Sequence, residues 1–252
     1  MVFKIFKFPL TGILSFLILN TFSVIFYPGY NKCSYINGAD CKSDSYSFKL
    51  NFFSELGSTY TNTDDDYWPL NEGGFNNKKN TISMILFNAS LVIVGLSIVT
   101  FYNSFLTLFK NDKNQKYFNK SAIASRYIGI TTGLMFIGIG LAPHDVNFSL
   151  HLFFANGGFL TLFILSIFHA RMLFISSTFS KSYSIGYIIF SFLLIIYVII
   201  IFFGPEIGPG LEFSRSELIF QVVAQKVIIL IFMFSMLFQL VGIRDILRKP
   251  IH

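Results

Sequence analysis

Six long apolar runs divide this chain and leave few folds open to it. A helix of about 20 apolar residues crosses the hydrocarbon core of a bilayer, and backbone groups there must be hydrogen-bonded within the segment. The first run is too long for the apolar core of a signal peptide and lacks a small-residue cleavage pattern, which favours a retained span. The sequence therefore predicts an all-α integral membrane protein, a six-transmembrane-helix bundle with a single membrane domain over 1–252. The expected spans are 8–27, 81–109, 125–142, 150–174, 184–204 and 217–243.

The composition excludes an ordinary soluble domain. Hydrophobic residues make up 53% of the chain and charged residues only 13%, whereas soluble domains carry about 25% charged residues. The net charge of +6 is spread over short segments between the apolar runs. No basic stripe with interleaved aromatic residues stands on a polar domain, so we expect no nucleic-acid partner.

Basic residues predict the orientation, because they are enriched in cytoplasmic loops. With six spans, the four groups of basic residues that flank the apolar runs fall on one side, which places both termini in the cytoplasm of a multi-pass protein in the cell (plasma or inner) membrane. The opposite side receives an extracytoplasmic loop, residues 28–80, and the turns 143–149 and 205–216. The basic residues of these four groups are Lys4, Lys7, Lys110, Lys113, Lys116, Lys120, Arg126, Arg171, Lys181, Arg244, Arg248 and Lys249. Acidic residues of the loop are Asp64, Asp65, Asp66 and Glu72.

Two sequence features predict local packing. The third run contains Gly129, Gly133, Gly138 and Gly140, and such small residues let neighbouring helices approach closely. The chain has two cysteines, Cys33 and Cys41, which lie eight residues apart in the outer loop. That spacing favours a small disulfide-closed turn in an oxidising compartment, with two free thiols as the alternative.

The last run contains the most unusual polar residue. Lys226 follows Glu217 by nine residues, about 13 Å along a helix, and an unpaired ammonium there costs at least about 2.5 kcal/mol. A carboxylate partner would have to come from the outer mouth, from Glu55, Asp145 or Glu217. The alternative is a Lys226 side chain that reaches the interface, or a shifted span.

The same run has a polar stripe, Glu217, Gln221 and Gln225, with Ser214 placed to form a capping box with Glu217. The stripe favours either hydrogen bonds between helices or the wall of a polar cavity.

Two further motifs carry candidate chemistry. His144 and Asp145, followed by His151, would hold a metal or share a proton, but their spacing matches no established zinc motif, so we predict no metal site. Asp145 has a structural alternative as the cap of the fourth helix. Ser54-Glu55-Leu56-Gly57 would complete a hydrolytic site if it met the histidines, and is otherwise a plain turn.

The order of these motifs resembles the prokaryotic membrane family called domain of unknown function 998 and, more distantly, the FRAG/DRAM/SFK-like proteins. The resemblance spans about 8–245, although Glu55 stands where Asp is common and Lys226 where Arg is common. It implies a six-helix bundle and, through the distant relatives, a lipid ligand. The motifs that carry it are Ser54-Glu55-Leu56-Gly57, Phe87-Asn88, Gly95-Leu96, Gly140–Asp145 with His151, and Gln225-Lys226.

These observations favour an outward-facing polar pocket that binds or modifies a membrane lipid without a cofactor. The main alternative is a non-enzymatic accessory or scaffold subunit whose partners are other membrane-protein subunits. A transporter is a third hypothesis, although no internal repeat supports it. The candidate catalytic residues are His151, Asp145 and Glu55. The candidate ligand-binding residues are Lys226, Gln225, Ser54, Asn88 and His144.

Overall fold

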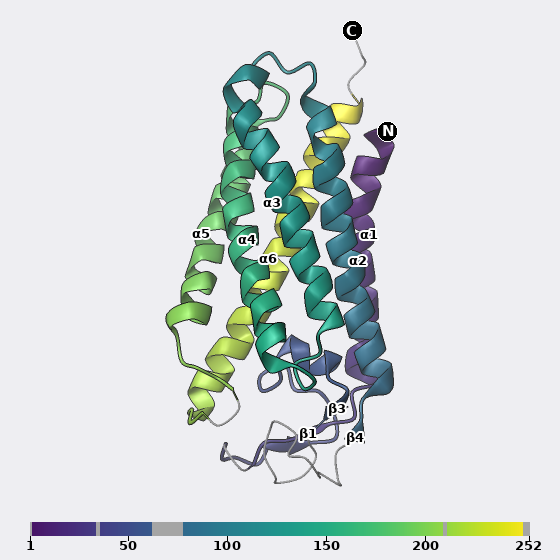
Figure 1. Ribbon diagram of the computed structural model, residues 1–252, viewed down its shortest axis with the longest axis vertical. Helices are drawn as coiled ribbons and strands as arrows, with labels where there is room; N and C mark the ends of the chain where they lie inside the picture. Colours follow the sequence, from purple (N-terminus) through teal and green to yellow (C-terminus); the bar gives the residue numbers. More distant parts are fainter. Residues whose placement is uncertain (1, 34–35, 62–77, 209–210, 249–252) are drawn as a thin grey trace.

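Six long helices make up most of the protein in a computed structural model, which describes residues 2–33, 36–61, 78–208 and 211–248. Each helix contains a segment that is long and apolar enough to cross a membrane. The predicted all-α, six-helix bundle is therefore confirmed. The helices are α1 (Val2–Ile25), α2 (Thr81–Phe105), α3 (Gln115–Leu141), α4 (Phe148–Ile175), α5 (Lys181–Phe203) and α6 (Arg215–Arg248) (Figure 1).

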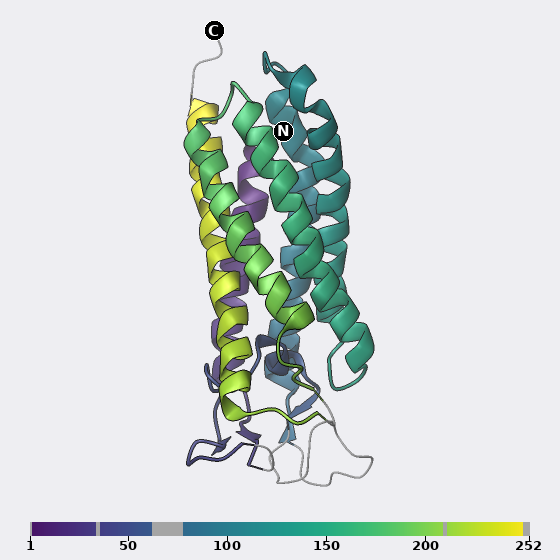
Figure 2. The ribbon, with the colours of Figure 1, turned by 90° about the vertical axis from the view of Figure 1, so that its left-hand side faces the viewer.

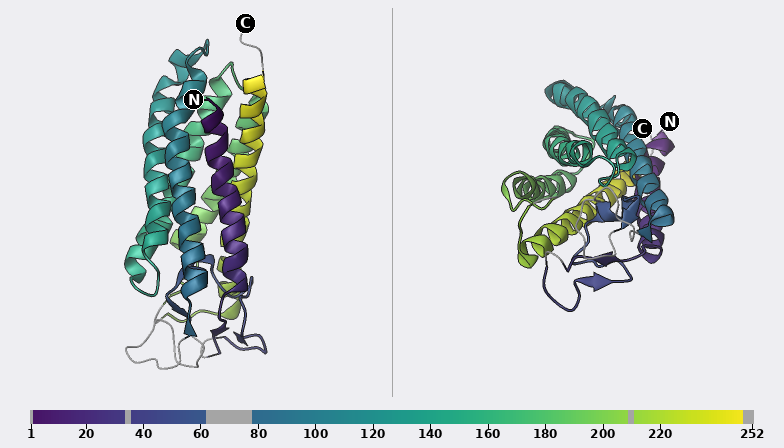
Figure 3. Two further views of the ribbon diagram at one scale, coloured as in Figure 1. Left: turned by 90° about the vertical axis from the view of Figure 1, so that its right-hand side faces the viewer. Right: turned by 60° about the horizontal axis from the view of Figure 1, so that its bottom comes forward.

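The helices run up and down in chain order, and α6 closes the bundle against α1 (Figures 2 and 3). Both chain ends lie at one end of the bundle, together with the connections 106–114 and 176–180 (Figure 1). We call this the terminal end. The described parts of the connections 26–80, 142–147 and 204–214 lie at the opposite end, which we call the loop end.

Close packing of α2 on α3 depends on glycine. A Cβ atom at Gly95 would clash with the carbonyl oxygen of Gly133, and a Cβ atom at Gly129 would clash with the ring of Tyr102. The backbones of α2 and α3 therefore lie in direct contact at Gly95 and Gly133, and Gly129 leaves room for the Tyr102 ring. The expectation that glycines of the third run bring helices together is confirmed.

Helix α3 begins at Gln115, well before the expected start of its span at residue 125. The first turns are polar in sequence, but Phe118, Ser121 and Ala122 are buried. That spacing places the three residues on one helix face, which packs inward while the polar residues remain outside. Hydropathy marks the apolar part of a helix, and this helix extends beyond it.

The loop end contains the shorter elements. Strand β1 (Tyr30–Asn31) pairs with β2 (Lys42–Ser43), and β3 (Tyr60–Thr61) pairs with β4 (Lys78–Lys79), both antiparallel. Two 3-10 helices are η1 (Phe53–Gly57) at the loop end and η2 (Leu106–Phe109) at the terminal end. The acidic residues Asp64, Asp65, Asp66 and Glu72 lie outside the described residues.

A disulfide joins Cys33 to Cys41, with 4.9 Å between the Cα atoms, as predicted. The turn that it closes is fastened to α6. Arg215 donates hydrogen bonds to both carboxylate oxygens of Asp40, at 2.5 and 2.6 Å, and to the carbonyl oxygen of Asn37 at 2.8 Å. The disulfide turn therefore holds the first turn of α6.

Candidate functional site

A cavity of about 390 Å³ lies at the loop end between α4, α5, α6 and η1. Its volume falls within the range of small-molecule sites, about 300–1,000 Å³. We call it the loop-end cavity. Its polar lining residues are Ser54, Glu55, His144, His151, Asn156, Tyr197, Glu206, Gln221 and Gln225. Its apolar lining residues are Phe52, Phe148, Leu152, Ala155, Phe159, Ile201, Phe202, Ile207 and Leu211, with Gly204 and Pro205 of the α5–α6 connection.

Gln221 and Gln225, two residues of the polar stripe on α6, line this cavity. The predicted capping box is confirmed: Ser214 N–H donates to the Glu217 carboxylate at 2.6 Å, and Glu217 N–H donates to Ser214 Oγ at 3.2 Å. One and two turns further on, Gln221 donates to the carbonyl oxygen of Pro205, and Gln225 accepts a hydrogen bond from Phe53 N–H at 3.0 Å. The stripe therefore joins the wall of the cavity to both neighbouring connections.

Two histidines meet at the same cavity from the α3–α4 connection and from α4. His151 is buried, and its Nδ1 lies 2.8 Å from the carbonyl oxygen of Ala142. Because a carbonyl only accepts, Nδ1 carries the proton, and Nε2 of the neutral ring has a lone pair. Among the described residues, Nε2 has no hydrogen-bond partner. The ring of His144 lies edge-on to that of His151, with centroids 5.8 Å apart.

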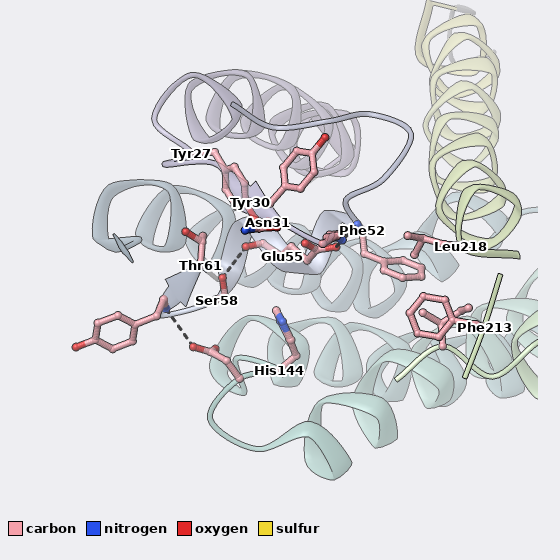
Figure 4. A pocket seen from close by; sticks show the side chains of 14 residues that line it. Tyr27, Tyr30, Asn31, Phe52, Glu55, Ser58, Thr61, His144, Phe213 and Leu218 are labelled. Atoms are coloured by element: carbon pink, nitrogen blue, oxygen red, sulfur yellow. Dashed lines mark hydrogen bonds and ion pairs between the residues drawn. The ribbon is translucent and has the colours of Figure 1, made fainter. Parts of the chain in front are cut away.

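His144 also lines a smaller pocket of about 40 Å³, with Glu55 on its opposite side (Figure 4). Burial lowers the pKa of His144 from its ordinary value of 6.5, while the carboxylates of Asp145 and Glu55 oppose that shift. The neutral imidazole is thus the favoured form at this position.

Asp145 fastens the outer loop rather than facing the loop-end cavity. One carboxylate oxygen accepts hydrogen bonds from Thr59 N–H at 2.8 Å, from Tyr60 N–H at 3.1 Å and from the Thr59 hydroxyl. The interpretation of Asp145 as the cap of the fourth helix is wrong. Asn147 caps α4 instead, and its side-chain oxygen accepts from Leu150 N–H at 3.0 Å.

The Glu55 side chain is 14% exposed, and its carboxylate is occupied by hydrogen bonds. Its carboxylate accepts from Phe52 N–H at 2.8 Å, from the Asn51 amide at 2.5 Å and from Lys32 Nζ at 2.8 Å. Lys32 also donates to the carbonyl oxygen of Leu50 at 2.6 Å. The burial of Lys32 was not predicted, because a lysine in a polar loop has no sequence feature that indicates burial.

Lys226 is 8% exposed and is held by a backbone group instead of a carboxylate. Its Nζ donates to the carbonyl oxygen of Asn51 at 2.5 Å and lies over the rings of Tyr46 and Phe53, at 5.3 and 5.4 Å from their centroids. Within the described part of the chain, no carboxylate oxygen lies within 4.0 Å of it.

Lys226 and Asn88 hold the loop and do not line the loop-end cavity. Asn88 donates to the carbonyl oxygen of Gly57 at 3.1 Å. The other candidate residues, Ser54, Glu55, His144, His151 and Gln225, come together around the cavity. Asn156 and Tyr197 also line it and were not predicted, since single polar residues within apolar runs are common.

Two of the candidate catalytic residues are not linked to each other. Asp145 and His151 form no hydrogen bond with each other, because the ring proton of His151 goes to Ala142. Among the described residues, no group of three His, Cys, Asp or Glu side chains gathers as a metal site would require. The polar lining of the cavity combines three amides, two hydroxyls, two imidazoles and two carboxylates: Asn156, Gln221, Gln225, Ser54, Tyr197, His144, His151, Glu55 and Glu206.

Comparison with known proteins gives no neighbour: no family model, curated protein or solved structure matches this chain.

Proposed function

We propose that this multi-pass membrane protein binds a membrane amphiphile and holds its uncharged, hydroxyl-rich head group in the loop-end cavity. The observation that carries the proposal is the lining of that cavity. Amides, hydroxyls, imidazoles and aromatic rings line it together with the carboxylates of Glu55 and Glu206, while Lys and Arg are absent from its described lining.

Membrane insertion is supported by the outer surface of the bundle. Large apolar side chains remain exposed along the helices, including Ile18, Phe192 and Phe234 at 54%, 64% and 69%. Exposed apolar side chains of this kind occur on all six helices, whereas soluble monomers rarely expose contiguous apolar patches larger than a few hundred Å². In the orientation that the basic residues favour, the loop end faces away from the cytoplasm.

The chemistry of the lining argues against a phosphate. Phosphate sites use Arg or Lys as charge-assisted donors, and both buried lysines of this region, Lys32 and Lys226, donate to loop groups instead. The Glu206 carboxylate would also repel an anion. The amides of Asn156 and Gln225 both donate and accept hydrogen bonds, which suits a head group with hydroxyls.

The mouth of the cavity suits an amphiphile. Leu152, Phe202 and Leu211 line the cavity and are also 38%, 47% and 41% exposed. An apolar rim beside a polar interior favours a ligand with one end of each kind. His151 lines the cavity, and its unprotonated Nε2 has a lone pair, so we assign it a role as a hydrogen-bond acceptor for the ligand.

The proposed function can be tested by identifying the lipid that remains bound to the purified protein. We expect native mass spectrometry from lipid nanodiscs to find a neutral lipid, such as a glycolipid, bound in preference to anionic phospholipids. Asn156→Leu should lower its occupancy several-fold, because the amide has no hydrogen-bond partner among the described residues. Asn119→Leu, the same change at an exposed site on α3, serves as the control.

Two results would overturn the proposal. One is equal lipid occupancy in the wild type and in well-folded Asn156→Leu. The other is a stoichiometric partner protein with no bound lipid, which would favour an accessory subunit.

A further inference from the structure

A second cavity continues the loop-end cavity into the bundle. It has a volume of about 70 Å³ and lies between α1, α2, α3, α4 and α6. We call it the core cavity. Its lining residues are Pro9, Gly12, Ile13, Phe16, Leu91, Val94, Ser97, Ile98, Phe136, Phe159, Leu162, Ile228, Ile229, Phe232, Met233 and Met236.

The two cavities lie in series along α4 and α6. On α4, Ala155 lines the loop-end cavity, Phe159 lines both cavities and Leu162 lines the core cavity. On α6, Gln225 lines the first cavity and Ile228 the second. Residues three or four apart share a helix face. The same faces therefore change from polar to apolar with distance from the loop end.

The core cavity is suited to hydrocarbon. Ser97 is its one polar lining side chain, and its hydroxyl already donates to the carbonyl oxygen of Ile93 at 2.8 Å. A cavity needs about 10–15 Å³ for each water-sized group, and apolar cavities stay dry and accept apolar ligands. Met233 and Met236 are flexible, so the walls adapt to a chain.

Among the described residues, Phe159 is the one that lines both cavities. Its ring packs edge-on against Tyr197, at 4.8 Å between centroids, and against Phe136, at 6.3 Å. Tyr197 lines the loop-end cavity and Phe136 lines the core cavity. Phe159 therefore lies where the two spaces come closest on α4.

We infer that the core cavity receives the hydrocarbon chain of the amphiphile whose head group occupies the loop-end cavity, and that Phe159 sets how far the chain enters. This inference rests on the proposed function and adds the ligand class: a polar head joined to a single chain. The distance along α6 from Gln225 to Phe232 is about 10 Å. Carbon atoms of the ligand chain beyond this length should add no affinity.

A series of alkyl glycosides with one head group and increasing chain length tests the inference. Each carries a photoreactive diazirine at the chain end, and binding is measured as saturable labelling of the protein in nanodiscs. We expect affinity to rise with chain length and then level off, with adducts on Phe232, Met233 or Met236.

Three variants locate the chain. Val94→Phe narrows the core cavity, so we expect long-chain glycosides to lose affinity about tenfold while short-chain glycosides bind as before. Val227→Phe, on the exposed face of α6, is the matched control. Phe159→Ala removes the ring that lines both cavities, so affinity should continue to rise with longer chains. This second variant keeps the test valid if Val94→Phe fails to fold.

The outcomes separate this inference from the proposed function. Saturable binding that Asn156→Leu weakens, but that Val94→Phe and Phe159→Ala leave unchanged, would overturn the inference alone. So would adducts confined to lipid-facing residues such as Val227 and Leu230. The absence of saturable binding for every glycoside would overturn both.

Discussion

Lys226 Nζ donates a hydrogen bond to the backbone carbonyl oxygen of Asn51 at 2.5 Å, and so connects the middle of α6 to the loop between α1 and α2. The next residue on the helix, Gln225, accepts from Phe53 N–H. Two consecutive α6 side chains thus hold the segment that precedes and begins η1. This segment forms one wall of the loop-end cavity, so the shape of the cavity depends on these contacts.

Removal of the ammonium group should loosen that wall. We expect Lys226→Met to lower the free energy of unfolding by about 1–3 kcal/mol, because a hydrogen bond to a charged group contributes about that much. Thermal unfolding in detergent measures the effect, with exposed Lys120→Met as the control. An unchanged midpoint in Lys226→Met would contradict the role assigned to this hydrogen bond.

The buried ion pair of Lys32 and Glu55 should behave as a coupled unit. Glu55→Gln leaves the ammonium of Lys32 without its carboxylate, and breaking a buried pair costs about 3–5 kcal/mol. Lys32→Met combined with Glu55→Gln should recover part of that loss, since no buried charge remains. A double-mutant cycle measures the coupling, and additive single effects would show that the pair does not interact.

Stability should fall as the pH falls below about 6.5, the ordinary pKa of histidine. Burial lowers the pKa of His144 in the folded protein, so the unfolded chain binds a proton that the folded protein resists. Protonation then favours unfolding between pH 6.5 and the lower folded-state pKa. We expect thermal midpoints of His144→Gln to depend less on pH in this window. Parallel pH profiles for wild type and variant would contradict the assignment.

The orientation predicts which exposed positions react with a membrane-impermeant maleimide on intact cells. Val146→Cys at the loop end should react, whereas Lys113→Cys at the terminal end should react only after permeabilisation. The native cysteines form a disulfide and do not interfere. The reverse pattern would place the loop end in the cytoplasm.

The sequence predicted the helices well because each one carries its own signal. Apolar length marked all six, and Ser214 with Glu217 marked the start of α6. The start of α3 at Gln115 was missed, since a helix that leaves the apolar layer keeps its hydrogen bonds but loses its hydropathy signal. The sequence motifs also predicted that Glu55, His151 and Gln225 belong to one site, and all three line the loop-end cavity.

The partners of the polar groups were harder to predict. The sequence favoured a carboxylate for Lys226, whereas the structure supplies the carbonyl oxygen of Asn51. Every residue has a backbone carbonyl, so the sequence does not indicate which one accepts a hydrogen bond from a given side chain. Asp145 likewise binds the backbone of Thr59 and Tyr60, a contact between segments that only the folded loop brings together.

A density map of the wild-type protein in nanodiscs made from its native membrane tests the central claim most directly. The account predicts a bound amphiphile with its head group within hydrogen-bond distance of Asn156 and Gln225. The opposite result is a loop-end cavity filled by the protein's own side chains or by water alone, with lipid only on the outer surface of the helices.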